Sequence, residues 1–353
     1  MIEGWKECTL GDAITLQRGH DLTRSKMVPG KYPVAGSNGV IGTHIEATTK
    51  GPGITIGRSG NVGNAYFYEA DFWAHNTTLY VKDFKGNSEK FLYYFLTRID
   101  FKQFNVGSAV PTLNRNHIHP LRITIPLLPE QKAIAGLLSS LDDKIDLLHR
   151  QNKTLEALAE TLFRQWFVEE ADDGWEEGEL GDYINIAYGK NLPTTKLTKE
   201  GYPVYGGNGQ IGYYTKYVYE KSQVLVACRG AACGTINICP PKSFVTNNSL
   251  ALEIGKRNEI TFEFLKYFSY THDFTLYVTG SAQPQITITN MYGAEFTLPP
   301  KVLIDKFTSI VGDFEGKLSE NHNQIKTLEK LRDTLLPKLM SGQVRVAYDR
   351  EAA

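Results

Sequence analysis

The chain repeats itself, and this duplication limits its possible folds more than any other feature. Residues 32 to 42, YPVAGSNGVIG, return as YPVYGGNGQIG at 202 to 212, with eight of eleven residues identical at a displacement of 170. QNKTLEALAETL at 151 to 162 reappears as QIKTLEKLRDTL at 324 to 335, where the displacement has grown to 173. A period this long, covering nearly the whole chain, predicts two copies of one structural unit with small loop changes between them.

Each copy changes character partway along. Its first part holds short runs of Val, Ile, Tyr and Phe between turn signals such as Asn38-Gly39 and Asn208-Gly209, which indicates short strands. Apolar residues at helical spacing in 91 to 101 and 262 to 274 add one helix to each domain. We therefore predict an α+β chain with a mixed α/β domain at 1–128, a long helix at 129–170, a second mixed α/β domain at 171–300, a second long helix at 301–342 and a tail at 343–353.

Both predicted long helices, which we expect to start after Pro129 and Pro300, carry an apolar heptad stripe. The seam positions are Leu141, Ile145, Leu148, Asn152 and Leu155 in the first helix and Phe314, Leu318, Asn321, Ile325 and Leu328 in the second. Because the order is domain, helix, domain, helix, stripes that bury each other require two antiparallel helices, a coiled-coil spacer in a pseudo-two-fold dumbbell. We predict that Asn152 pairs with Asn321 and fixes the register. The alternative is that both asparagines reach solvent at the edge of the seam.

The composition excludes several classes of protein. Hydrophobic residues make up 41%, enough for packed domains, and no apolar run approaches the roughly 20 residues that a membrane span needs. The start, MIEGWKECTLGD, does not resemble a secretion signal, and four cysteines do not make a disulfide framework. We expect a cytoplasmic protein without a membrane partner.

Charge is distributed unevenly along a nearly neutral chain. The whole sequence has 38 basic and 39 acidic residues, but residues 1 to 128 hold 14 basic and 10 acidic residues and residues 183 to 300 hold 10 and 7. Two similar, mildly basic domains on a rigid spacer suit two nearby, unequal sites, and half-sites on one face of double-stranded DNA lie roughly 34 Å apart per helical turn. Since phosphate contacts dominate affinity for DNA, so weakly basic a chain would need a partner.

At this point the residues carry a resemblance. The helix sequences LLSSLDDKIDLLHRQNKTLEALAETLFRQWFVE and HNQIKTLEKLRDTLLPKLMSGQVRV, the repeated WxxxxLGD openings, GSAVP and LLPEQKAI resemble the specificity (S) subunit of type I restriction-modification systems over the full chain. The resemblance implies two target recognition domains that each read half of a split, asymmetric DNA sequence. It also implies that the helices at 129–170 and 301–342 dock methyltransferase (M) subunits, two of them, and that restriction (R) subunits join the complex. The second helix departs from this pattern, because it opens with PPKVLIDKF in place of Pro-Glu-Gln.

Polar loop residues are the candidates for DNA contact, since Arg and Lys can bind guanine edges and Asn and Gln adenine edges. The candidates in the first domain are Arg18, Lys26, Arg58, Asn61, Asn76, Asn114, Arg115 and Asn116, and those in the second are Lys190, Asn191, Arg229, Asn247, Asn248, Gln283, Gln285 and Thr287. Aligning the copies at a displacement of 171 pairs Arg58 with Arg229, and a contact kept in both copies suits phosphate better than bases. Sequence reading is instead expected where the copies differ, as in 110–115 against 283–287.

Motifs for catalysis and for metal binding are weak throughout. No GxxxxGK(S/T) segment is present, and the Cys239-Pro240-Pro241-Lys242 segment lacks the flanking residues of an amino-methyltransferase motif. Cys228, Cys233 and Cys239 have no common metal-ligand spacing, and we interpret them as buried thiols. We interpret His117 and His119 as a surface pair or a DNA contact, and Asp142-Asp143-Lys144 as a solvated helix face.

The function predicted from these features is that of a non-catalytic DNA-specificity subunit that binds no metal or cofactor itself. S-adenosylmethionine, ATP and magnesium are then expected on the partner subunits. The alternative is a two-domain module that binds glycans or proteins and uses the helices as a spacer. A self-contained methyltransferase or nuclease is disfavoured, because no site for either reaction is evident.

Overall fold

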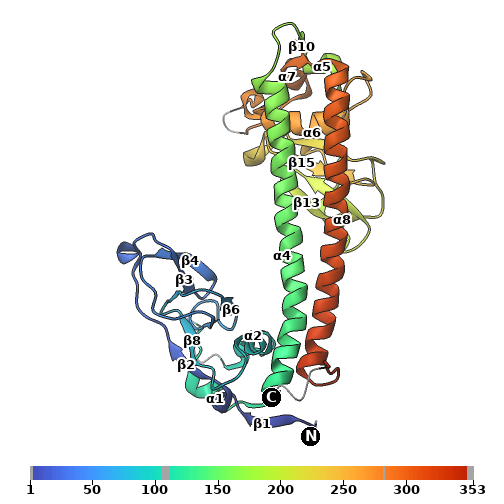
Figure 1. The fold of residues 1–353 in the computed structure, drawn as a ribbon. Coiled ribbons are helices and arrows are strands. Elements are labelled where there is room, and N and C mark those ends of the chain that lie inside the picture. The colour runs from blue at the N-terminus through green and yellow to red at the C-terminus, as the bar shows by residue number, and fades with distance from the viewer. Residues whose placement is uncertain (1–2, 105–110, 281–282, 348–353) are drawn as a thin grey trace. The chain divides into compact units, whose positions relative to one another are not determined.

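The computed structural model describes residues 3–104, 111–280 and 283–347, and the chain divides into two compact units (Figure 1). Unit 1 comprises Met1–Leu148 and Asn323–Ala353, and unit 2 comprises His149–His322. Two long helices, α4 (Leu128–Arg164) and α8 (Lys301–Met340), contribute residues to both units. Neither of these helices, nor any other in the described part of the chain, is long and apolar enough to cross a membrane.

Unit 1 contains a four-stranded antiparallel sheet in the order β2-β8-β5-β6, a three-stranded sheet in the order β4-β3-β7, and the pair β1-β9. Its elements are β1 (Trp5–Thr9), α1 (Leu10–Ala13), β2 (Thr15–Arg18), β3 (Tyr32–Gly36), β4 (Gly39–His44), β5 (Gly53–Gly57), β6 (Ala65–Tyr68), β7 (Trp73–Ala74), β8 (Thr78–Asp83), α2 (Glu89–Thr97), α3 (Arg115–Ile118) and β9 (Arg122–Pro126), with short 3₁₀ turns at Arg24–Lys26 and Phe101–Phe104.

Unit 2 repeats this order, with sheets β11-β17-β14-β15 and β13-β12-β16 and the pair β10-β18. Its elements are β10 (Glu176–Glu179), α5 (Leu180–Tyr183), β11 (Asn185–Tyr188), β12 (Tyr202–Gly206), β13 (Gly209–Tyr214), β14 (Gln223–Ala227), β15 (Ile236–Cys239), β16 (Phe244–Val245), β17 (Ser249–Glu253), α6 (Phe262–Thr271), α7 (Ile288–Tyr292) and β18 (Glu295–Leu298), with 3₁₀ turns at Thr194–Lys196, Gly230–Ala232 and Phe274–Tyr277 and a π-helical turn at Gln165–Glu169 after α4. The predicted duplication is therefore present in three dimensions.

The sequence pattern explains these elements. The predicted Asn-Gly turns join β3 to β4 and β12 to β13, and Gly39 and Gly209 have φ values of +90° and +91°, which favour glycine. The runs GITIG and QVLVA form β5 and β14, each of which pairs with a strand on either side. Both faces of β14 are buried, because Val224 and Val226 pack in one apolar cluster and Leu225 packs in another. Short alternating runs thus produced strands where we expected them.

Helices α2 and α6 join each domain to a long helix in equivalent ways. Tyr94 of α2 donates its hydroxyl proton to Asp142 Oδ2 at 2.6 Å, and Tyr267 of α6 donates to Glu315 Oε1 at 3.0 Å. Asp142 also accepts from Arg332 Nη1 at 2.9 Å. The interpretation of Asp142 as part of a solvated helix face was therefore wrong, because its carboxylate is the anchor for α2.

The two long helices run antiparallel within each unit. In unit 1, Ile145 and Leu148 of α4 form a buried cluster with Ile325 of α8, and in unit 2 Phe163 packs edge-on against Phe307. Of the ten predicted seam residues, Leu141, Ile145, Leu148, Asn152, Leu318, Asn321 and Ile325 are buried, and Leu155, Phe314 and Leu328 are half-buried. Helix α4 begins at Leu128, one residue before Pro129, whereas Pro300 immediately precedes α8.

The two seam asparagines are hydrogen-bonded to each other. Asn321 Nδ2 donates to Asn152 Oδ1 at 2.8 Å, and the two residues are 0% and 5% exposed, so the predicted pair exists and does not reach solvent. Asn152 Nδ2 and Asn321 Oδ1 have no partner. One bond therefore satisfies only half of the polar atoms of the pair, at a position where apolar side chains would pack without that cost.

Candidate nucleic-acid interface

Unit 1 has a polar hollow of about 680 Å³, which we call the first hollow. It is lined by Gln17, Arg18, Gly19, His20, Asp21, Arg58, Leu79, Thr112, Leu113, Asn114 and Arg115. The end of β2 with the residues after it, the turn after β5, Leu79 of β8 (Thr78–Asp83) and the segment that leads into α3 supply these residues, so four separate parts of the chain converge here. Four of the eight DNA candidates of the first domain, namely Arg18, Arg58, Asn114 and Arg115, lie in its wall.

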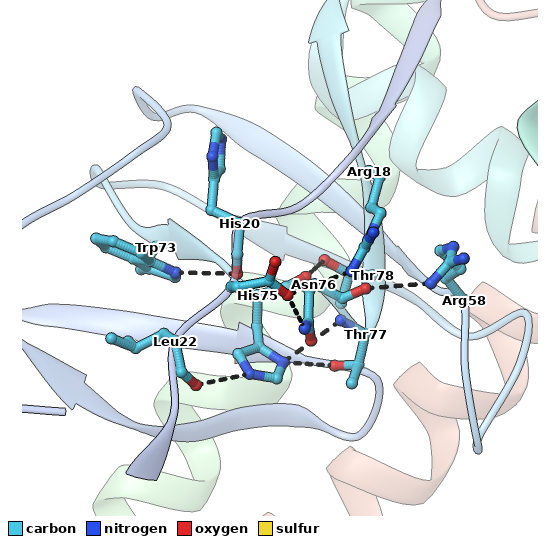
Figure 2. A network of polar contacts seen from close by, with 10 residues as sticks. Arg18, His20, Leu22, Arg58, Trp73, His75, Asn76, Thr77 and Thr78 are labelled. Carbon is cyan, nitrogen blue, oxygen red and sulfur yellow. Dashed lines mark hydrogen bonds and ion pairs between the residues drawn. The ribbon is translucent and has the colours of Figure 1, made fainter. Parts of the chain in front are cut away.

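One carboxylate organises the donors on one side of this hollow. Asp21 Oδ1 lies 3.2 Å from Arg18 Nη2 and also accepts from the Asn76 side-chain amide. Arg58 Nη1 donates to the Asn76 carbonyl oxygen at 3.4 Å, as Figure 2 shows. The Arg18 and Asp21 side chains are 54% and 75% exposed, so the ion pair adds little stability and its donors remain accessible to a ligand.

The loop that carries Asn76 is itself held in place by its neighbour. His75 Nδ1 lies 2.9 Å from Thr77 Oγ1 and Nε2 lies 3.1 Å from the Leu22 carbonyl oxygen (Figure 2). Our candidate set included neither His75 nor Asp21. The sequence carried no signal for them, because the contacts join segments that lie more than fifty residues apart.

Two of the candidates in the wall, Asn114 and Arg115, already have internal partners, and three others lie outside the hollow. The Asn114 side chain caps α3 by accepting from the Asn116 amide at 3.0 Å, and Arg115 Nη1 donates to the Leu16 carbonyl oxygen at 3.1 Å. Lys26, Asn61 and Asn116 are exposed but do not line the first hollow. The structure therefore brings together half of the set and leaves the other half dispersed or only adjacent.

Unit 2 has two adjoining hollows, of about 690 and 630 Å³, that share Arg229, Gly230 and Ala231; together we call them the second hollow. Four candidates line it, namely Arg229, Asn248, Gln283 and Gln285. Lys190, Asn191, Asn247 and Thr287 do not, and the Thr287 hydroxyl caps α7 by accepting from the Asn290 amide at 3.2 Å. Val110, at the start of one segment where the copies differ, lies outside the described residues.

The backbone bonds of the two hollows show that Arg58 and Arg229 are not equivalent. Leu113 N donates to the carbonyl oxygen of Arg58 at 2.8 Å, whereas its counterpart Ile286 N donates to that of Cys228 at 3.0 Å. The isolated β-bridges lead to the same pairing of residues. Ser59 forms a bridge with Thr112, and Arg229 forms one with Gln285, the counterpart of Thr112. The true counterparts are therefore Arg58 with Cys228 and Ser59 with Arg229.

The sequence alignment was wrong here by one residue. Gly60 is equivalent to Gly230, and Gly63 is equivalent to Gly234. Two residues separate the glycines in unit 1 and three separate them in unit 2, so the extra residue of unit 2 lies just after Gly230. Neither position therefore carries an arginine in both copies, and the inferred shared phosphate contact has no basis in the structure.

Of the three cysteines interpreted as buried thiols, Cys228 and Cys239 are buried and Cys233 is half-buried. Burial raises the pKa of Cys228 to about 11, and burial also raises the pKa of Cys233 and of Cys239, so all three stay protonated near neutral pH. Cys228 Sγ and Cys233 Sγ donate to the carbonyl oxygens of Asn247 and Pro284 at 3.7 and 3.2 Å. Within the ranges that the structure describes, no three His, Cys, Asp or Glu side chains come together as metal ligands would.

His119 has an internal partner, so its interpretation as a surface residue or a DNA contact was wrong. Its Nε2 accepts a hydrogen bond from the Leu16 amide at 3.1 Å. Burial, with Arg115 and Lys85 nearby, holds the pKa of His119 below its usual value, which keeps the ring neutral and able to accept. His117, in contrast, is exposed.

Known proteins resemble this chain in sequence over most of its length. The family model described as Type I restriction modification DNA specificity domain matches residues 2–157 and 172–330. The MjaIX type I restriction enzyme specificity subunit of Methanocaldococcus jannaschii is 26% identical over 308 residues, which cover 74% of this chain and 70% of that protein. The MjaVIII specificity subunit of the same organism is 21% identical over 402 residues and covers 98% of this chain and 94% of its own.

A solved structure shares the fold. The crystal structure of the type I restriction-modification S subunit from M. genitalium superposes with a TM-score of 0.71 at 23% identity and covers 95% of this chain and 96% of that chain. The two matched segments of the family model fall one on each copy of the repeat and together cover most of the sequence. The chain thus belongs to the family of type I restriction modification DNA specificity domains, contains two of them, and is a specificity subunit, the non-catalytic component of a restriction-modification complex.

Proposed function

We propose that the two units read the two halves of one bipartite, asymmetric double-stranded DNA target, through the first hollow and the second hollow respectively. The observation that carries this proposal is that each hollow is lined in part by the same turn of the repeat, through Arg58 in unit 1 and through Arg229 and Gly230 in unit 2, but the walls are otherwise unlike; Thr112 and Gln285 are the one equivalent pair that lines both. Arg18, Asp21, Arg58 and Arg115 line the first, while Arg229, Asn248, Gln283 and Gln285 line the second. The shared turn suits a common task in both units, and different hydrogen-bonding groups in the walls suit different base sequences.

The long helices are proposed to form the spacer between the half-sites and to dock the partners. In this arrangement α4 and α8 continue as one antiparallel coiled coil, and the chain is a pseudo-two-fold dumbbell. The apolar side chains exposed along these helices would face two methyltransferase subunits, with restriction subunits joining the complex; they are Leu128, Leu137, Leu147, Leu158, Val302 and Leu331. S-adenosylmethionine, ATP and magnesium would be bound by the partner chains, in the cytoplasm where the host DNA lies.

The test is to express the chain with the methyltransferase encoded beside its gene and to map methylated adenines across the host genome. We expect one split motif with two unlike halves, and exchanging residues 3–128 for the corresponding domain of another specificity subunit should change one half only. Methylation that continues unchanged after this chain is deleted, with no complex on co-purification, would contradict the proposal and favour a glycan- or protein-binding module.

A further inference from the structure

We infer that the position occupied by Ser59 in unit 1 and Arg229 in unit 2 determines sequence specificity, and that Arg229 recognises a guanine edge in the major groove of one half of the target. The inference rests on the proposed function, because it assumes that the second hollow faces DNA. The proposed function names only the hollow, whereas here one residue, its counterpart in the other copy and the recognised base are specified.

The equivalence of the two positions rests on backbone geometry alone. The glycine that follows each donates to a proline carbonyl oxygen, Gly60 to Pro111 at 3.3 Å and Gly230 to Pro284 at 2.9 Å. These two glycines have φ values of +80° and +73°. A serine and an arginine thus occupy the same place in the same turn.

The side chains at the preceding position show which way the turn faces. Arg58 Nη1 and Cys228 Sγ each donate to a carbonyl oxygen, that of Asn76 at 3.4 Å and that of the equivalent Asn247 at 3.7 Å. Successive side chains of an extended segment alternate in direction. Arg229 therefore points away from this internal contact, and it is exposed and lines both parts of the second hollow.

The Arg229 side chain differs from the arginine side chains of the first hollow, because it has no partner among the residues that the structure describes. Arg18 is paired with Asp21, Arg58 bonds to the Asn76 carbonyl oxygen and Arg115 to that of Leu16. Among the described residues, no hydrogen bond or ion pair engages the guanidinium of Arg229. The N–H groups of Arg229 can therefore bind a ligand, and no internal contact has to break first.

The surroundings favour a base edge over a phosphate. No lysine or second arginine lines the second hollow; its other polar side chains are amides and one hydroxyl, from Asn208, Thr235, Asn248, Gln283 and Gln285. A guanidinium presents a rigid fork that matches O6 and N7 of guanine, and this is the commonest specific contact to DNA. A phosphate anchor needed by both half-sites would also be expected at the equivalent position of unit 1, which holds Ser59.

The experiment compares Arg229→Ser, which copies unit 1, with Ser59→Arg in complexes with the methyltransferase subunits. Methylation is measured on two DNA libraries, each randomised in one half of the mapped motif. We expect Arg229→Ser to lower discrimination for guanine at one base pair of one half by about tenfold or more and to leave the other half unchanged. Ser59 is half-buried and does not itself line the first hollow, but it follows Arg58, which does; the longer side chain of Ser59→Arg should therefore change the preference of that other half only.

A matched control and the salt dependence separate the possible outcomes. Lys196→Ser, which removes an exposed cation of unit 2 outside the second hollow, should leave every base preference unchanged. Arg229→Ser could instead weaken DNA binding equally on all sequences and reduce the slope of log affinity against log salt concentration by about one. That result would identify a phosphate contact and overturn the inference. Unchanged preferences would overturn it as well. If the wild-type complex methylates no split motif, the proposed function itself has failed; a split motif that Arg229→Ser does not alter contradicts only this inference.

Discussion

The two units anchor their short helices to the long helices alike but differ in the side chains that line their hollows. Tyr94 and Tyr267 reach equivalent carboxylates, Asp142 and Glu315, on the long helices. In contrast, three arginines line the first hollow and one lines the second. At the positions equivalent to Arg18, Arg58 and Arg115, unit 2 has Tyr188, Cys228 and Ile288, so the repeat keeps the anchors of its short helices while the polar groups around the hollows change.

The starts of the two long helices differ just as strongly. Glu130 and Gln131, the third and fourth residues of α4, are fully buried and polar, while the third and fourth residues of α8 are Leu303 and Ile304. Gln131 accepts from the Ser88 amide and donates to the Asn87 side chain, and Glu130 binds Arg345 of the C-terminal tail. The departure of α8 from the Pro-Glu-Gln pattern thus matches a helix start that holds no tail.

Removing the tail arginine should give the largest effect. Arg345 donates through Nη2 to Glu130 Oε2 at 2.7 Å and through Nη1 to the Glu3 carbonyl oxygen at 3.1 Å, and Glu130 is 0% exposed. Arg345→Ala leaves a buried carboxylate without its counter-ion, so unit 1 should lose about 3 kcal/mol of stability. Hydrogen exchange of the β1 and β9 amides measures this loss, with β10 and β18 as the unaffected reference.

The control gives unit 1 the apolar residue that unit 2 already has. Glu130→Leu combined with Arg345→Leu removes both charges, and we expect it to recover most of the lost stability. If the double variant is as unstable as the single one, the packing of the Arg345 stem holds the tail, and the buried charge does not explain the effect.

The seam asparagines offer a second, smaller contrast, because the seam of unit 1 is apolar where unit 2 has Asn152 and Asn321. Asn152→Leu removes the single bond between them and leaves the other amide buried without a partner. It should destabilise unit 2 by about 2 kcal/mol. Replacing both with leucine should raise the thermal unfolding temperature above that of the wild type, at the expense of the register. A double variant no more stable than the single one would show that the pair is not costly here.

Much of the fold could be predicted from periodicity, because the signals are local. The seven-residue spacing of apolar residues predicted the long helices and their seam. Asn-Gly turns between apolar runs predicted the hairpins. The Asn152–Asn321 pair followed from applying the two-fold of the repeat to one helix stripe. These inferences needed only neighbouring residues and the duplication itself.

The candidate site was only partly predictable, because its contacts are set by tertiary structure. Matching Arg58 with Arg229 favoured identical residue types, whereas the backbone bonds from Leu113 and Ile286 show that the added residue comes after Gly230. The anchoring role of Asp142 depends on a tyrosine that arrives from α2. Such pairings have no signature in the spacing of the residues involved.

The smallest expected effect concerns one hydrogen-bond acceptor that differs between the two units. His119 Nε2 accepts from the Leu16 amide in unit 1, and the Tyr292 hydroxyl accepts from the equivalent Ile186 amide at 3.5 Å in unit 2. Burial, followed by the charges of Arg115 and Lys85, lowers the pKa of His119. The unfolded chain therefore takes up a proton near pH 6.5 before the folded one does, so the contribution of His119 to stability is complete above that pH and declines as the pH falls through the lowered pKa.

His119→Tyr should remove this part of the pH dependence by giving unit 1 the acceptor of unit 2. Urea unfolding at pH 7.5 and 5.5 should show a smaller loss of stability in the variant than in the wild type, by less than about 1 kcal/mol because the ring is only partly shielded from solvent. His117→Tyr, at an exposed position two residues away, serves as the control and should leave the wild-type slope unchanged. Burial also lowers the pKa of His272 in unit 2, so a residual slope is expected in all three proteins. Identical slopes in wild type and His119→Tyr would mean that the imidazole can be protonated without losing the Leu16 contact, and the two acceptors would then be equivalent in acid as well as at neutral pH.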